Sequence, residues 1–266
     1  MKKQIKIGIL GCGTMGSAIL ERILEKRIFK TKDIFINDKD KKKEKKISER
    51  YKVRPSKVNE LLAESDFIIL AMKPQDFLSF AKENIFPKDK VVISIIAGVK
   101  INLIKKVLGV KKIVRAMPNL MVRIGEGVIV WKEQGLSSDE TTVAREIFNA
   151  LGAEIGVKRE DLIDRATLIS GCGPGYLYFF EDLLLKSFSR LGFSKEFALK
   201  LLLNTFLGAI LYQKEKKYKL EDLVKMVATK GGITEKFLDT LKEKQIYAIF
   251  EQAAQNAYRR NKERKI

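Results

Sequence analysis

Residues 5–16 read Ile5-Lys6-Ile7-Gly8-Ile9-Leu10-Gly11-Cys12-Gly13-Thr14-Met15-Gly16. The apolar run at the start predicts a buried strand, and apolar residues at helical spacing from Met15 to Ile23 predict a helix after it. The pattern G-x-G-x-x-G is weak evidence alone, but between a strand and a helix it is typical of dinucleotide binding. We therefore expect this loop to bind a cofactor through Gly11, Cys12, Gly13, Thr14, Met15 and Gly16.

Each glycine of this loop has an expected role. Gly11 allows the tight turn, Gly13 lets the pyrophosphate approach the backbone, and Gly16 permits close packing of the helix. The free N–H groups at the helix start then bind phosphate. The alternative is a glycine-rich turn in an α/β protein that binds no cofactor.

Short apolar runs alternate with helical patterns as far as residue 160. The expected strands are Ile5–Leu10, Ile34–Ile36, Phe67–Met72, Val91–Ile96, Ile113-Val114, Gly127–Trp131 and Ala153–Val157. This alternation predicts a mainly parallel, doubly wound sheet of the Rossmann type, with helices on both faces. Ser137 and Glu140 form a capping-box pattern that opens a helix toward Leu151.

After Glu160 the pattern is helical almost throughout. The expected helices are Leu162–Ser170, Tyr176–Leu191, Lys195–Lys216, Leu220–Val227 and Ile246–Arg260, with a sharp break at Gly171–Gly175. We therefore predict a dinucleotide-binding domain over residues 1–160 and an all-α domain over residues 161–266. The broad apolar faces of these helices favour packing against a second copy of the chain, and the alternative is a self-contained bundle.

Cofactor preference is left open by the residues after the second strand. Asn37, Asp38 and Lys39 follow it, and Asp38 lies 22 residues after Gly16, near the spacing of a ribose-binding carboxylate. That spacing favours NADH, and replacing such a carboxylate by serine should shift preference toward NADPH. Lys39, Lys41 and Lys42 favour NADPH instead, because they can neutralise a 2′-phosphate.

Two further segments follow expected strands, where a doubly wound sheet has its binding crevice. Ala71, Met72, Lys73 and Pro74 follow the strand that begins at Phe67, and Ala97 and Gly98 follow the strand that begins at Val91. Their small residues would let a dinucleotide lie close to the backbone. An ordinary strand-to-helix turn is the alternative for Lys73-Pro74.

Composition excludes several other classes of function. The 266 residues contain no histidine and only Cys12 and Cys172, so we expect no metal site and no histidine-based catalysis. The longest apolar runs are too short to span a membrane, and the cysteine count favours the cytoplasm. The net charge of +19 is densest over Lys39–Arg54. We interpret this segment as a solvated face, and the alternative is nucleic-acid binding with steep salt dependence.

Taken in order, the motifs resemble those of the pyrroline-5-carboxylate reductase family over nearly the whole chain. The matching segments are Ile7–Met15, Ala71–Gln75, Ser94–Gly98, Arg115–Asn119, Gly125–Gly127, Ser170–Tyr176, and Thr205 with Gly208-Ala209. The resemblance implies reduction of 1-pyrroline-5-carboxylate, a cyclic imine, to L-proline by NADPH or NADH. It also implies a homodimer, or a higher homo-oligomer, formed through the C-terminal helices.

The resemblance further implies a substrate site within residues 227–234. Thr229, Lys230, Gly231 and Gly232 would bind the substrate carboxylate, with the glycine N–H groups free before a helix that starts near Thr234. Thr234 would be catalytic by forming a hydrogen bond with the ring nitrogen. Capping of the neighbouring helices is the alternative role of Thr229 and Thr234.

This chain departs from the family pattern at four positions. Thr229-Lys230 replaces Ser-Pro, Ile233 replaces a small residue, and Val58 stands where an asparagine is frequent near the adenosine ribose. The changes at Lys230 and Ile233 keep two alternatives open. One is a related imine or hydroxyacid reductase with another anionic substrate, and the other is a non-catalytic dinucleotide-binding protein.

Overall fold

The computed structural model describes residues 4–263. Residues 1–3 of the first expected domain and residues 264–266 of the second lie outside the described residues. The chain divides into two compact units, Met1–Cys172 with Arg260–Ile266 and Gly173–Arg259.

The first unit contains one eight-stranded sheet in the order β3-β2-β1-β4-β5-β6-β7-β8. Its strands are β1 Ile7–Leu10, β2 Ile34–Asn37, β3 Arg54–Pro55, β4 Phe67–Leu70, β5 Val91–Ser94, β6 Lys112–Met117, β7 Gly127–Gln134 and β8 Gly152–Gly156. All neighbouring strands are parallel except β6 and β7, which pair antiparallel with Ala116 opposite Trp131. The strand order reverses between β1 and β4, which makes this pair the switch point of a doubly wound sheet.

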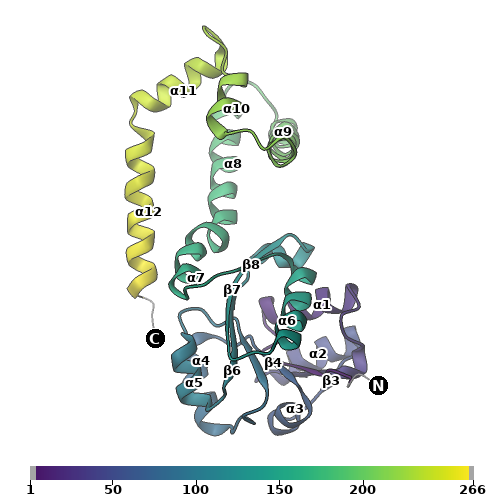
Figure 1. The fold of residues 1–266 in the computed structure, drawn as a ribbon. Helices are drawn as coiled ribbons and strands as arrows, with labels where there is room; N and C mark the ends of the chain where they lie inside the picture. The colour runs from purple at the N-terminus through teal and green to yellow at the C-terminus, as the bar shows by residue number, and fades with distance from the viewer. Residues whose placement is uncertain (1–3, 264–266) are drawn as a thin grey trace. The chain divides into compact units, whose positions relative to one another are not determined.

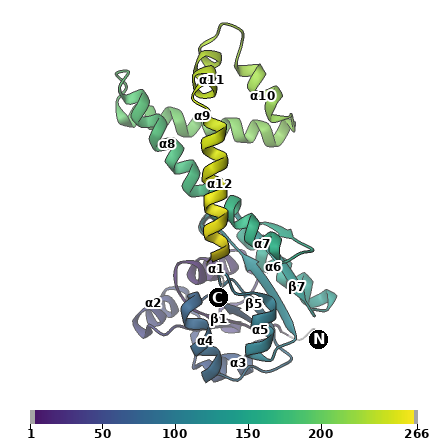
Figure 2. The same ribbon diagram turned by 90° about the vertical axis from the view of Figure 1, so that its left-hand side faces the viewer.

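Alternate residues of each strand are buried on opposite faces of the sheet. Ile7 and Ile9 of β1 pack in one core with residues of α1 and α6, whereas Leu10 packs in the other with residues of α3, α4 and α5 (Figure 1, Figure 2). Because both faces are covered, every residue of β1, β2, β4 and β5 is buried. The helices of this unit are α1 Thr14–Glu25, η1 Thr31–Asp33, α2 Lys41–Tyr51, α3 Val58–Glu64, α4 Pro74–Glu83, α5 Ile101–Leu108, η2 Leu120–Ile124, α6 Ser138–Leu151, α7 Asp161–Ala166 and the π-helical turn η3 Thr167–Gly171.

The predicted Rossmann-type sheet is confirmed, and the differences are local. The expected strand Ile113-Val114 is longer at both ends, and at its C-terminal end the reason is that Arg115, which interrupts the apolar run, is fully buried. The two-residue strand β3 was missed, since Arg54-Pro55 has no apolar pattern. The capping box is confirmed at α6, where Ser137 Oγ accepts from the Glu140 N–H and Glu140 accepts from the Ser137 N–H.

The second unit is helical, as predicted. Its helices are α8 Gly173–Ser189, α9 Lys195–Lys216, α10 Leu220–Val227, α11 Ile233–Glu243 and α12 Ile246–Glu263, the last of which ends in the first unit. The predicted break at residues 171–175 is confirmed but shorter than expected. One helix ends at Gly171 and α8 begins at Gly173, so only Cys172 lies outside a helix, and its N–H bonds to the Thr167 carbonyl at 3.0 Å. Within residues 4–263, no helix is both long and apolar enough to cross a membrane.

Candidate functional site

A crevice of about 660 Å³ opens at the carboxyl ends of β1, β2 and β4 in the first unit. This is the edge at which the strand order reverses, where doubly wound folds bind their ligands. The predicted cofactor residues that line it are Gly11, Gly13, Asn37, Asp38, Lys39, Ala71, Met72 and Lys73. Cys12, Thr14, Met15, Gly16, Pro74, Ala97 and Gly98, which were also predicted, are not among the lining residues.

The glycine-rich loop has the geometry that a dinucleotide requires. Gly11 has φ +104°, and a Cβ there would lie 2.7 Å from the Ala71 carbonyl oxygen. A Cβ on Gly16 would lie 2.0 Å from the Gly11 carbonyl oxygen, so only glycine lets α1 start this close to the loop. A Cβ on Gly13 would meet nothing within 4 Å. Gly13 therefore faces open space at the start of α1, which fits a pyrophosphate.

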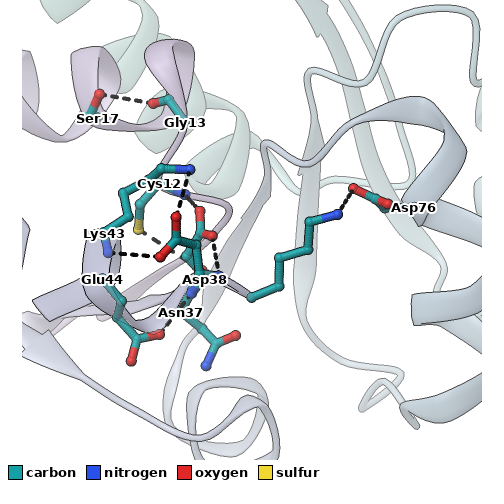
Figure 3. A network of polar contacts seen from close by, with 10 residues as sticks. Cys12, Gly13, Ser17, Asn37, Asp38, Lys43, Glu44 and Asp76 are labelled. Carbon is teal, nitrogen blue, oxygen red and sulfur yellow. Dashed lines mark hydrogen bonds and ion pairs between the residues drawn. The ribbon is translucent and has the colours of Figure 1, made fainter.

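Asp38 joins the end of β2 to this loop. Its Oδ2 accepts a hydrogen bond from the Cys12 N–H at 2.6 Å, and its Oδ1 accepts from the Asp40 N–H at 2.8 Å (Figure 3). Its own N–H donates to Glu44 Oε2 at 2.8 Å. Asp38 is buried, and these main-chain donors hold its carboxylate.

Cys12 is buried at the centre of the loop. Burial, followed by the nearby negative charges of Asp38 and Glu44, raises the pKa of this thiol to about 12. The thiol is therefore protonated at neutral pH. It donates to the Asn37 carbonyl at 4.0 Å, and the main-chain N–H of Cys12 donates to Asp38.

Five lysines line the crevice: Lys39, Lys41, Lys43, Lys57 and Lys73. Three of them pair with carboxylates, Lys39 with Asp76 at 2.8 Å, Lys41 with Glu44 at 2.8 Å and Lys43 with Asp40 at 4.0 Å. Such a concentration of cations creates a positive potential that attracts anionic ligands.

One wall of the crevice was missed by sequence reasoning. Asp76, Ser79, Phe80 and Glu83 of α4 line it. Their spacing of three and four residues places them on one helix face. That spacing was visible in the sequence, but only the fold shows that this face of α4 borders the crevice.

The predicted substrate loop lies in the second unit, between α10 and α11. Thr229 and Lys230 are exposed, Gly231 is exposed with φ +76°, and Ile233, the first residue of α11, is 93% exposed. Thr234 is half-buried at the second position of α11, so it does not cap the helix, and Gly232 occupies the N-cap.

The expectation that the two glycine N–H groups are free is wrong. The Gly231 N–H donates to Glu235 Oε2 at 2.6 Å, and the Gly232 N–H donates to the Thr229 carbonyl at 2.9 Å. The physical reason is that orphan N–H groups before a helix attract a carboxylate from its first turn. Glu235 thus occupies the donor that was assigned to the substrate carboxylate.

The mainly parallel sheet, the open glycine-rich loop and the lysine-lined crevice define a dinucleotide-binding protein of the Rossmann class, with a helical second unit. Two family models match the chain. Residues 160–264 match the pyrroline-5-carboxylate reductase dimerisation domain, and residues 6–98 match the NADP oxidoreductase, coenzyme F420-dependent, domain.

Curated relatives agree over most of the chain. The pyrroline-5-carboxylate reductase of Aquifex aeolicus is 33% identical over 90% of both chains, and pyrroline-5-carboxylate reductase 2 of Bacillus subtilis is 32% identical over 95% of this chain and 94% of its own. The crystal structure of the Plasmodium falciparum pyrroline carboxylate reductase, with NADP bound, covers 98% of both chains at 30% identity and a TM-score of 0.85. This chain belongs to the pyrroline-5-carboxylate reductase family, which confirms the resemblance and the enzyme class predicted from the motifs.

Proposed function

We propose that this protein reduces 1-pyrroline-5-carboxylate to L-proline with NADPH or NADH, the final step of proline biosynthesis. The observation that carries the proposal is the crevice in which Gly13 faces open space among five lysines, in a chain of this family. When bound, the dinucleotide supplies a hydride to the imine carbon. The ring nitrogen keeps its proton, so the imine becomes a secondary amine and the cofactor is oxidised.

The protein's own residues bind and orient the dinucleotide and the substrate. The loop from Gly11 to Gly16 would hold the pyrophosphate, with Ala71–Pro74 and Ala97-Gly98 beside the rest of the dinucleotide. The Thr234 hydroxyl would accept a hydrogen bond from the protonated ring nitrogen. Thr229, Lys230, Gly231 and Gly232 would bind the carboxylate once Glu235 releases the Gly231 N–H and the Thr229 carbonyl releases the Gly232 N–H. Positioning is sufficient for much of the acceleration, because a protonated imine is already electrophilic. This chemistry needs no histidine.

NADPH is the cofactor that the crevice favours. Asp38 is buried and each of its carboxylate oxygens already accepts from a main-chain N–H, so little of the carboxylate is left for a ribose hydroxyl. The lysines that follow it can neutralise a 2′-phosphate. The relative from Plasmodium falciparum, whose structure has NADP bound, is consistent with this preference.

Assembly, domain boundary and location complete the proposal. We place the start of the helical domain at residue 161, beside the start of the dimerisation-domain match at residue 160.

Only Ala198 and Leu202 are buried among the residues of α8 to α12, which supports a homodimer or higher homo-oligomer through these helices. Two free cysteines support a reducing compartment such as the cytoplasm.

The test is the steady-state oxidation of NADPH and of NADH at equal concentrations, with and without 1-pyrroline-5-carboxylate. Imine-dependent turnover, faster with NADPH, is the expected result. Turnover only with six-membered or open-chain imines would favour the alternative substrate that Lys230 and the exposed Ile233 suggest. Dinucleotide binding without turnover on any imine would favour a non-catalytic role.

A further inference from the structure

An ion pair joins the two sides of the crevice. Lys39 follows β2, Asp76 lies in the first turn of α4 after β4, and Lys39 Nζ is 2.8 Å from Asp76 Oδ2 (Figure 3). Strands β2 and β4 flank β1, whose carboxyl end carries the glycine-rich loop. The pair therefore spans the loop on which the dinucleotide is proposed to lie, and both residues line the crevice.

Two neighbouring charged residues, Asp38 and Lys41, are less available than Lys39. Asp38 is held by main-chain donors, and Lys41 pairs with Glu44, whose side chain is only 11% exposed and also accepts from the Asp38 N–H. Removing Lys41 from Glu44 would leave a nearly buried carboxylate with fewer partners, which is costly. Asp76 is 31% exposed and Lys39 is 76% exposed, so water can replace either partner of that pair.

We propose that Lys39 exchanges Asp76 for the 2′-phosphate of the bound cofactor, and that this exchange sets the preference for NADPH over NADH. The inference rests on the proposed dinucleotide site. Exposed ion pairs contribute little to stability, whereas a lysine and a phosphate dianion form a stronger charge-assisted contact. Lys39 lies directly after the residue that approaches the ribose in this class of fold.

Lys39 and Asp76 have opposite effects on the affinity for NADPH. Lys39 stabilises a 2′-phosphate, and Asp76 competes with that phosphate for the same ammonium group. NADH has no anion at this position, so Lys39 stays paired with Asp76 when NADH binds. Asp76 is therefore a residue that lowers the affinity for NADPH without contributing to the binding of NADH.

The experiment is titration calorimetry of the full chain with adenosine 2′,5′-bisphosphate and with 5′-AMP, which differ only in the 2′-phosphate. Lys39→Gln should weaken the affinity for the bisphosphate roughly ten-fold and change the affinity for 5′-AMP by less than about two-fold. Asp76→Asn should strengthen the affinity for the bisphosphate roughly three-fold and leave the affinity for 5′-AMP unchanged. Most of the gain from Asp76→Asn should disappear in the double variant, and Lys39→Arg should retain the preference.

Lys88→Gln and Asp89→Asn are matched controls. They make the same charge changes on exposed residues before β5, at the opposite edge of the sheet, and should have little effect. Equal losses of bisphosphate affinity in Lys39→Gln and Lys88→Gln would overturn the exchange. They would indicate instead that the overall positive charge of the protein attracts the ligand. A wild-type chain that binds both ligands equally would also overturn it.

The same experiment separates this inference from the proposed function. A chain that binds the bisphosphate as expected but reduces no imine would refute the function and leave the exchange standing. Normal imine turnover with unchanged ligand preference in Lys39→Gln would refute the exchange alone. Far-UV circular dichroism of each variant establishes that the fold is retained.

Discussion

The Asp38 carboxylate accepts a 2.6 Å hydrogen bond from the main-chain N–H of Cys12, which ties the end of β2 to the glycine-rich loop of β1. Both groups are buried. Because β1 and β2 are neighbours in the sheet, this contact sets the distance between the glycine-rich loop and the lysine-rich segment that begins at Lys39. Asp38 is thus a positioning residue for the cofactor loop in this structure.

Asp38→Asn should weaken the binding of NADH and NADPH by similar factors. The variant loses a buried hydrogen bond to a charged acceptor, so the free energy of unfolding should fall by about 1–2 kcal/mol. Dissociation constants for both cofactors, with Asp89→Asn as control, provide the measurement. A marked shift toward NADPH in Asp38→Asn or Asp38→Ser would instead show that the carboxylate contacts the ribose.

Thr234→Ala should lower turnover of the imine by about ten-fold or more, with cofactor affinity unchanged. The proposed contact of its hydroxyl is to the reacting nitrogen, and one lost hydrogen bond in a transition state has about this effect. Thr240→Ala is a matched control on the same helix, because that hydroxyl donates to the Lys236 carbonyl. Equal turnover in both variants, measured under saturating cofactor, would remove Thr234 from the mechanism.

Glu235→Ala should lower the KM for 1-pyrroline-5-carboxylate. Its carboxylate holds the Gly231 N–H at 2.6 Å and must leave before a substrate carboxylate can use that donor. Removing a competing anion should lower KM by roughly three-fold or more, with kcat little changed. Glu243→Ala, at the other end of α11, is the control. A higher KM in Glu235→Ala would show that Glu235 assists substrate binding.

Arg115→Ala should destabilise the first unit strongly. Arg115 is fully buried, and its guanidinium pairs with Glu160 at 3.1 Å and Asp164 at 2.5 Å. Removing one partner of a buried ion pair leaves uncompensated charge, so the free energy of unfolding should fall by about 3–5 kcal/mol. Urea denaturation measures this change.

Arg159→Ala is the comparison for Arg115→Ala. Arg159 pairs with Asp161 at the surface, and its side chain is 67% exposed. Its removal should leave the denaturation midpoint unchanged, because water replaces the lost partner. Similar midpoints for both variants would contradict the role assigned to the buried cluster.

Much of the fold followed from local sequence patterns. The apolar runs placed strands β1, β2, β4 and β5 to within two residues at each end, and helical spacing placed α9 and α10 at their observed bounds. These strands are buried on both faces, so they are continuous apolar runs in the sequence, and the apolar residues of α9 and α10 recur at helical spacing. Both signals are present in the chain itself. The glycine-rich loop was equally local, since its turn and its helix start lie within six residues.

The remaining features depend on residues far apart in the sequence. Arg115 extends β6 only because Glu160 and Asp164 neutralise it, and Lys39 meets Asp76 only because β2 and β4 both neighbour β1. Sequence spacing placed Asp38 near a ribose, but the tertiary structure directs its carboxylate to Cys12 and Asp40. By itself, the sequence determined which elements form and which motif binds the dinucleotide. Only the tertiary structure decided which charges meet at the crevice, because the strand order sets the distances between them.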